Sequence, residues 1–208
     1  MENNTIKAVF FDLGKVLLRF RHEEIVSRLL SAADDADDKA DGLFDFLFDS
    51  RSGLCNLYDE GNISSEDFYA EIDRRFGLGV DYSGFVPLWN EIFSLDSDVA
   101  DLMRRVRGTR PVYLLSNVNE LHWEHVAERY PALSEMDGWV LSCRVKAKKP
   151  SPVIYDAAKA AAGVGPGESV FIDDLPENAA AADSAGIKGI VFTGADTLER
   201  ELRLLGLI

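Results

Sequence analysis

The sequence predicts an α/β protein in which helices cover both faces of a mostly parallel sheet and a helical insert follows the first strand. Short apolar runs alternate with helical patterns along most of the chain. These runs are apolar throughout, which is typical of parallel strands that are buried on both faces. Residues 20–95 differ, because they contain helix-like patterns and no convincing strand.

The predicted strands begin with residues 6–11 (IKAVFF), where β-branched and aromatic residues form a short buried run. The later runs that predict strands are residues 111–115, 139–141, 169–172 and 189–192, of which 139–141 is the weakest pattern. The helices predicted between and after them are residues 99–106, 120–130, 152–162 and 176–185. Gly186 follows the last of these and is placed to end it in the left-handed conformation.

Within the insert, helix-like patterns cover residues 23–30, 43–48, 68–76 and 85–93. Ser65 is predicted to cap the third, because Glu66 and Asp67 fall in its first turn, where the helix dipole favours anions. The charge run 34–41 (DDADDKAD) predicts a solvated loop or helix end. We therefore expect a core of residues 1–20 and 95–208 and a helical cap of residues 21–94.

Composition narrows the classes of function. The 208 residues carry 22 Lys and Arg against 36 Asp and Glu, a net charge of -14, which argues against nucleic acid and anionic membranes as partners. Two cysteines form no disulfide framework, and neither a signal peptide nor a membrane span is apparent. We expect a cytoplasmic protein, as a monomer or homodimer, that acts on a small molecule.

The chemistry is expected at the carboxyl ends of the strands, where parallel sheets bind ligands. Three carboxylates there would repel one another unless a cation is present, and Mg²⁺ suits such oxygen ligands. The Gly14 carbonyl could add a further oxygen. A lysine before the fourth strand could point into the same crevice. The residues concerned are Asp12, Ser116, Asn117, Lys149, Asp173 and Asp174.

This set favours phosphoryl transfer. A carboxylate such as Asp12 can attack phosphorus and form an aspartyl-phosphate. The Lys149 ammonium would supply positive charge, and Ser116 and Asn117 would bind phosphoryl oxygens.

The order of these motifs resembles the haloacid-dehalogenase-like (HAD) superfamily, and most closely its small-capped subgroup of α-D-glucose-1-phosphate phosphatase-like proteins. The residues that carry the resemblance are FFDLG at Asp12, LLSN at Ser116, KKPSPVIY at Lys149 and VFIDDLPENAAAADSAGI at Asp173 and Asp174. It implies a Rossmann-like core with a helical cap. It also implies Asp12 as nucleophile and metal ligand, Asp174 as direct Mg²⁺ ligand and Asp173 as an outer or water-mediated one.

One position departs from the family pattern. Most phosphatases of this family have a second Asp two residues after the nucleophile, which acts as general acid and base, whereas this chain has Gly14. A sugar 1-phosphate would need less acid assistance, because its anomeric oxygen is less basic. His22 is a conceivable substitute, although a hinge or surface histidine is the simpler interpretation. His122 and His125 are interpreted as helix-face residues.

Three functions therefore compete. The first is a Mg²⁺-dependent phosphatase of a small phosphorylated metabolite, with a sugar phosphate as the candidate. The second is a catalytically weak or non-enzymatic binding module, which Gly14 favours, and the third is a metal-independent haloacid dehalogenase, which EDTA would not inhibit. Substrate choice is expected in residues 15–21 and in the cap, with Arg19, Tyr58, Trp89 and Asn90 as candidate contacts.

Overall fold

The structure is a computed structural model that describes residues 5–31 and 36–208, apart from the side chains of residues 36 and 37. Its main sheet has five parallel strands in the order β5-β4-β1-β6-β7. These strands are β1 (Ala8–Phe11), β4 (Val112–Ser116), β5 (Gly138–Leu141), β6 (Ser169–Asp173) and β7 (Lys188–Val191). The predicted Rossmann-like α/β fold is confirmed.

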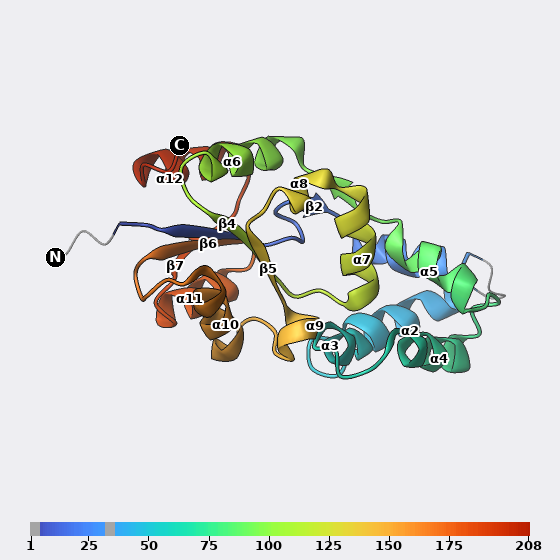
Figure 1. Cartoon of the computed structure of the whole chain (residues 1–208). Helices are drawn as coiled ribbons and strands as arrows, with labels where there is room; N and C mark the ends of the chain where they lie inside the picture. The colour runs from blue at the N-terminus through green and yellow to red at the C-terminus, as the bar shows by residue number, and fades with distance from the viewer. Residues whose placement is uncertain (1–4, 32–35) are drawn as a thin grey trace.

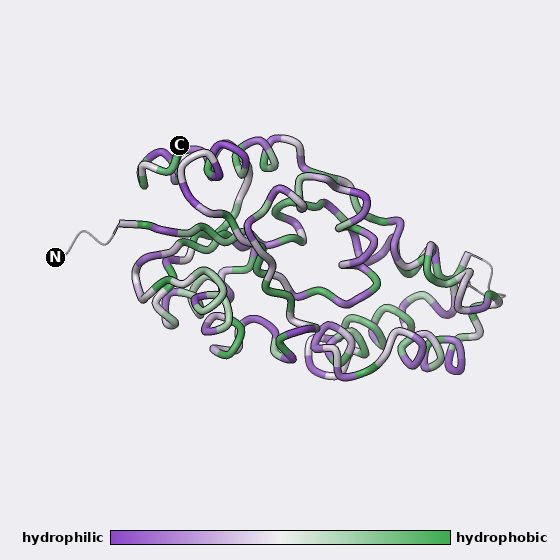
Figure 2. Tube along the Cα trace, in the orientation of Figure 1, coloured by the Kyte–Doolittle hydropathy of each residue, from purple (hydrophilic) through white to green (hydrophobic). Residues whose placement is uncertain are grey.

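Helices cover both faces of this sheet (Figure 1). The core helices are α6 (Ser97–Arg107), α7 (Glu120–Arg129), α8 (Pro131–Ser134), α9 (Ser142–Val145), α10 (Pro152–Ala162), α11 (Pro176–Ser184) and α12 (Ala195–Leu204). Alternate residues of β1 point to opposite faces: Val9 and Phe11 pack in the cluster that contains α6 and α12. Ala8 and Phe10 pack with α10 and α11. The strands are among the most hydrophobic segments of the chain (Figure 2), as this two-sided burial requires.

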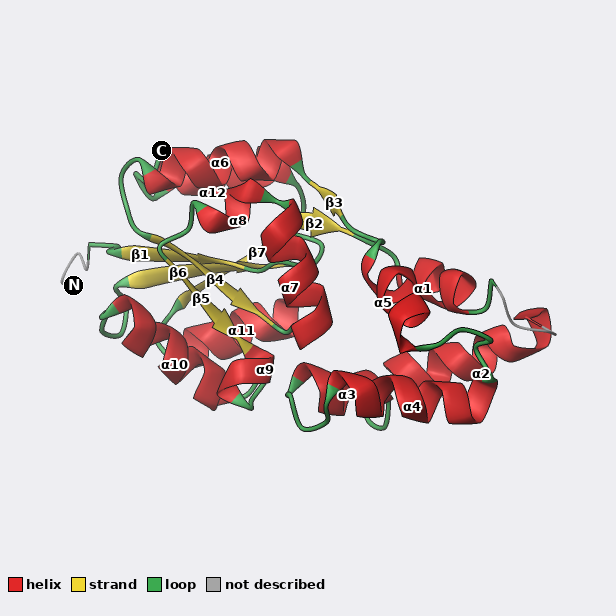
Figure 3. Cartoon of the chain, turned by 45° about the vertical axis from the view of Figure 1, so that its right-hand side comes forward, coloured by secondary structure: helices red, strands yellow, loops and turns green. Residues whose placement is uncertain are grey.

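The insert after β1 is helical. It contains α1 (His22–Leu29), α2 (Ala36–Phe48), α3 (Leu54–Asp59), α4 (Ser65–Phe76) and α5 (Tyr82–Asn90). These helices lie to one side of the sheet (Figure 3) and bury a hydrophobic cluster of their own. The chain enters and leaves the insert through a short antiparallel ribbon, in which β2 (Leu18–Arg19) pairs with β3 (Ser94–Leu95).

Several local predictions need correction. The cap of α4 is Ser64, whose side chain accepts a hydrogen bond from the Asp67 N–H, whereas the Ser65 hydroxyl is buried against the Tyr58 hydroxyl. Residues 34 and 35 of the predicted solvated run lie outside the described residues, and the remainder belongs to α2. The sequence patterns do not indicate α3, α8, α9, α12 or the β2–β3 ribbon. Most are too short for a clear hydrophobic period.

Gly186 ends α11 as predicted. It has a φ of 83°, its N–H donates to the Asp183 carbonyl at 3.0 Å, and the Ile187 N–H donates to the Ala182 carbonyl at 2.8 Å. Within residues 5–31 and 36–208, no helix combines the length and hydrophobicity that a membrane crossing requires.

Candidate active site

The carboxyl ends of three adjacent strands bring the predicted polar residues together. Asp12 directly follows β1, Ser116 is the last residue of β4, and Asp173 is the last residue of β6. Because β1 lies between β4 and β6 in the sheet, Asp12 occupies the centre of this group.

Lys149 lies between two of these carboxylates. Its Nζ is 2.8 Å from Asp12 Oδ1 and 2.6 Å from Asp173 Oδ2, and its side chain is only 2% exposed. The loop before α10 is held by Asn117, whose Oδ1 accepts the Lys149 N–H at 2.8 Å and whose Nδ2 donates to the Lys149 carbonyl at 3.1 Å. Both ends of the Asn117 amide thus hold the backbone of Lys149.

The two consecutive aspartates at the end of β6 have different environments. Asp173 is fully buried, and its Oδ1 also accepts the Leu175 N–H at 2.9 Å and Asn178 Nδ2 at 3.0 Å. Asp174 is half-buried. Asn178 was not predicted as a site residue, although it falls five residues after Asp173 in the first turn of α11.

The donor set fits a hard divalent cation. Asp12, Asp173 and Asp174 each offer a carboxylate oxygen, and these oxygens lie within 4.8 Å of one another. Mg²⁺ prefers such all-oxygen sites, to which the carbonyl of Gly14 in the neighbouring loop could contribute.

Burial and charge shift the protonation equilibria of the group. Burial, with help from Asp173, raises the pKa of Asp12 to about 6, although Lys149 opposes this. Burial alone would lower the pKa of Lys149, but Asp12 and Asp173 outweigh it and hold the pKa above its ordinary value. The pKa of Asp174 is raised by burial and by Asp173, against the opposing charge of Lys15. One lysine, Lys149, thus faces a group of three neighbouring carboxyl groups.

A side chain at Gly14 would have to displace the ring of Phe20. A Cβ at this position would lie 2.9 Å from Cε1 of Phe20, which is closer than real Cβ contacts come. The ring of Phe20 therefore crowds the position from which an acid/base side chain would start.

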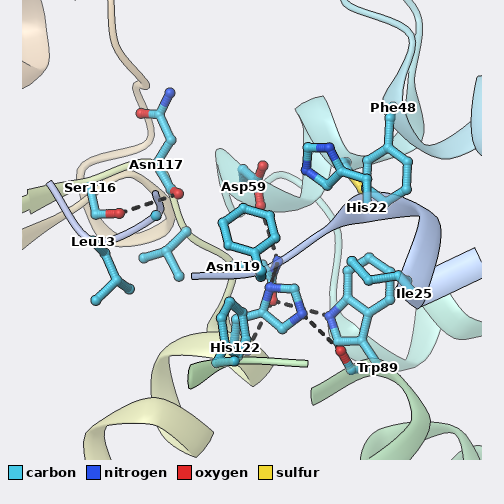
Figure 4. A pocket seen from close by; sticks show the side chains of 15 residues that line it. Leu13, His22, Ile25, Phe48, Asp59, Trp89, Ser116, Asn117, Asn119 and His122 are labelled. Atoms are coloured by element: carbon cyan, nitrogen blue, oxygen red, sulfur yellow. Dashed lines mark hydrogen bonds between the residues drawn. The ribbon is translucent and has the colours of Figure 1, made fainter. Parts of the chain in front are cut away.

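A cavity of about 140 Å³ adjoins the strand ends. Figure 4 shows its lining, which combines residues of the sheet loops with side chains of the helical insert. Gly14 contributes from the loop after β1 and Ser116 from the end of β4, whereas His22, Phe48 and Trp89 come from α1, α2 and α5. The cavity thus lies between the insert and the residues that adjoin Asp12 at the strand ends.

The suggested substrate contacts divide into two groups. Of the four, only Trp89 lines this cavity. Arg19 instead pairs with Asp96 at 2.6 Å, Tyr58 is buried against Ser65, and Asn90 is buried.

His22 and His122 both line the cavity. The ring of His22 stacks on Phe48 with centroids 4.3 Å apart. His122 lies on the buried face of α7 and links insert and core, because its Nε2 lies 3.1 Å from the Trp89 carbonyl. Burial lowers the pKa of His122 to about 3. The sequence could not reveal this, because the contact with Trp89 depends on the packing of α5 on α7.

The sequence model of the haloacid dehalogenase-like hydrolases matches residues 6–186. The chain is 25% identical to a sesquiterpene phosphatase from Aspergillus oryzae over 97% of each chain. It is 26% identical to a D-ribitol-5-phosphate phosphatase from Bacteroides thetaiotaomicron, covering 83% of this chain and 85% of that protein. A HAD family enzyme from Bacteroides thetaiotaomicron, solved with magnesium and inorganic phosphate, superposes with a TM-score of 0.78 at 27% identity, covering 89% of this chain and 93% of that one.

Proposed function

Because the chain belongs to the haloacid dehalogenase-like hydrolase family, we propose that it is a Mg²⁺-dependent phosphatase that hydrolyses a small phosphorylated metabolite through an aspartyl-phosphate on Asp12. The general class, a phosphoric monoester hydrolase, is shared with its named relatives. The observation that carries the proposal is the buried contact of 2.8 Å between Lys149 Nζ and Asp12 Oδ1 at the centre of the strand ends.

This contact suits a nucleophilic carboxylate. Asp12 Oδ1 accepts both Lys149 Nζ and, at 2.7 Å, the Leu13 N–H. Among the described residues no hydrogen bond engages Oδ2, so Lys149 and Leu13 fix the carboxylate through one oxygen and leave the other open. In the first step a bond forms between a carboxylate oxygen of Asp12 and phosphorus, the bond from phosphorus to the leaving oxygen breaks, and the leaving oxygen takes a proton from solvent.

In the second step water attacks the phosphorus of the aspartyl-phosphate, which releases inorganic phosphate and restores Asp12. Lys149 stabilises the charge of the transferred group, and the Ser116 hydroxyl, at the end of β4, donates to a phosphoryl oxygen. Asn117 acts on this chemistry by holding the backbone of Lys149.

The site residues also suit the metal. Asp12, Asp174 and the Gly14 carbonyl would hold Mg²⁺ directly, and Asp173 would act through water because Lys149, Leu175 and Asn178 already occupy its oxygens. When bound, Mg²⁺ supplies positive charge beside the transferred phosphoryl group.

We assign the role of a substrate-covering cap to the insert, within residues 21–94, because its side chains line the cavity beside Ser116. A lid of this kind excludes water and admits small molecules. A sugar phosphate, a cytoplasmic location and a monomeric or homodimeric state stay predictions from the sequence.

The test is a phosphatase assay on an aryl phosphate and on a panel of phosphorylated metabolites, with Mg²⁺ and with EDTA. We expect hydrolysis that EDTA abolishes and that Asp12→Asn removes. Asp156→Asn, which changes an exposed carboxylate on α10, is the control and should be fully active. Activity of Asp12→Asn equal to wild type would refute the nucleophile, and hydrolysis of a 2-haloacid in EDTA would favour the dehalogenase.

A further inference from the structure

Most of the surface of the cavity beside the proposed phosphate site is apolar. Its hydrophobic side chains from the insert and its flanking segments are Phe20, Ile25, Phe48, Trp89 and Phe93. The same cavity is lined by Leu13, Gly14 and Ser116 of the sheet loops, so it opens onto the strand ends. A phosphate held there would direct its leaving group into this space.

The aromatic rings form a continuous wall. The ring of Phe20 contacts that of His22 at 5.2 Å and that of Phe93 at 5.5 Å, measured between centroids. The ring of His22 stacks on Phe48 in turn. Such a wall offers dispersion contacts and few hydrogen-bonding groups to a ligand.

Several polar atoms on the Trp89 side chain, Asn119 and His122 in the cavity lining already have partners within the protein. The Trp89 indole N–H donates to Asn119 Oδ1 at 3.4 Å, and Asn119 Nδ2 donates to Asp59 Oδ1 at 3.1 Å. The two nitrogens of His122 face Asn119 and the Trp89 carbonyl. A leaving group with many hydroxyls would lose its hydration here and find few free partners, which is unfavourable.

The volume of the cavity also favours a small apolar group. The cavity of about 140 Å³ is close to the ~150 Å³ of an apolar cavity that is known to bind benzene. It therefore has room for a ring or a branched chain of about six carbons.

We propose that the substrate is a monophosphate ester of a largely apolar alcohol, whose hydrocarbon part fills the cavity between Phe20, Phe48 and Trp89. This inference rests on the proposed phosphatase function and narrows the class of substrate. It favours an apolar phosphate ester over the sugar phosphate that was considered from the sequence.

A matched pair of substrates tests the inference. Hexyl phosphate and a hexitol 6-phosphate both have six carbons and a primary ester oxygen, and they differ in the hydroxyl groups. We expect kcat/KM for hexyl phosphate to be at least 10-fold higher, since each buried methylene is favourable. A hexitol ester turned over equally well or better would overturn the inference and leave the phosphatase intact. Failure of both esters and of the aryl phosphate would overturn both proposals.

Variants of Phe48 test whether the preference for hexyl phosphate arises in the cavity. Phe48→Ala should reduce the preference for hexyl phosphate about 10-fold, and Phe48→Leu should largely restore it. Phe46→Ala is the matched control, because Phe46 lies on the same helix, is half-buried like Phe48 and packs on Phe76 and Arg75 instead. Equal loss in both Ala variants would contradict the assignment.

Binding provides a readout that does not need turnover. Hexylphosphonate, which has no scissile ester bond, should bind wild type at least 10-fold more tightly than methylphosphonate in calorimetry. Phe48→Ala should remove most of this difference and Phe46→Ala none of it. Equal affinity of wild type for the two phosphonates would refute an apolar leaving-group site.

Discussion

Phe20 crowds the space that a side chain on Gly14 would need: a Cβ at position 14 would lie 2.9 Å from Cε1 of Phe20. Gly14 provides no carboxyl group, and the ring of Phe20 packs against the same position. The aromatic wall of the cavity therefore reaches the position at which most phosphatases of the family have a general acid.

Gly14→Asp alone should therefore give no gain in activity. The new side chain must displace Phe20, and overpacking of this kind costs about 1–3 kcal/mol of folding free energy. Urea unfolding and kcat for an alkyl phosphate measure both effects. An unchanged free energy of unfolding together with a higher kcat would show that Phe20 does not block the position.

The double variant Gly14→Asp/Phe20→Ala should behave differently, since the ring is gone. A general acid typically contributes ~10²–10⁴-fold, so we expect a faster turnover of poor leaving groups than in Phe20→Ala alone. Phe20→Ala is the necessary reference, because it also enlarges the cavity. No difference between the two would mean that an acid at position 14 cannot reach the leaving oxygen.

Lys149→Met should destabilise the protein strongly. The change leaves the buried carboxylates of Asp12 and Asp173 facing each other without a cation, and breaking a buried ion pair costs about 3–5 kcal/mol. Mg²⁺ should raise the melting temperature more in this variant than in wild type. Lys148→Met is the control, because Lys148 bonds Asn56 and not the carboxylates. A Lys149→Met protein as stable as wild type without metal would contradict this account.

Asp59→Asn should make the protein more stable at neutral pH. Burial raises the pKa of Asp59 to about 6 in the folded state, although Asn119 and Lys148 oppose it. As pH rises from about 4 to 6, the unfolded chain loses this proton first, so the folded state loses stability, and the deficit stays constant above pH 6.

The neutral amide removes this deficit. Because Asp59 keeps some contact with solvent, we expect a gain on the order of 1 kcal/mol above pH 6 and none near pH 4. Urea unfolding between pH 4 and 8 measures it. Asp49→Asn is a control of opposite sign, because hydrogen bonds from Ser52 and Arg51 lower the pKa of exposed Asp49. A gain for Asp59→Asn that is independent of pH would refute the assignment.

Gly61→Ala should push the loop after α3 in the insert away from α9 in the core. Gly61 has a φ of 64°, and a Cβ there would lie 2.3 Å from the carbonyl oxygen of Cys143 in α9. Gly77→Ala is a matched control, because Gly77 has a φ of 61° with nothing within 4 Å. Both variants incur about 1–2 kcal/mol of left-handed strain. We expect only Gly61→Ala to raise KM as well, and equal KM values in the two variants would contradict this.

The sequence by itself determined the sheet and the position of the chemistry along the chain. The apolar runs at β1, β4 and β6 are local signals, and Asp12, Ser116 and Asp173 stand directly at their ends. Parallel strands present such residues at one edge, so their proximity follows from the fold class alone. The cap of α4 shows the limit, since either Ser64 or Ser65 satisfies the local pattern and only packing assigns Ser65 to Tyr58.

The tertiary structure decided which side chains of the site contact one another. The reach of Lys149 to both Asp12 and Asp173, and the use of Asn117 to hold its backbone, depend on a loop whose course no local pattern fixes. The aromatic cavity combines Phe20, Phe48 and Trp89 from segments far apart in sequence. The local sequence around each of these aromatic residues indicates only ordinary helix or loop packing. Their common surface therefore arises only when the insert packs beside the strand ends.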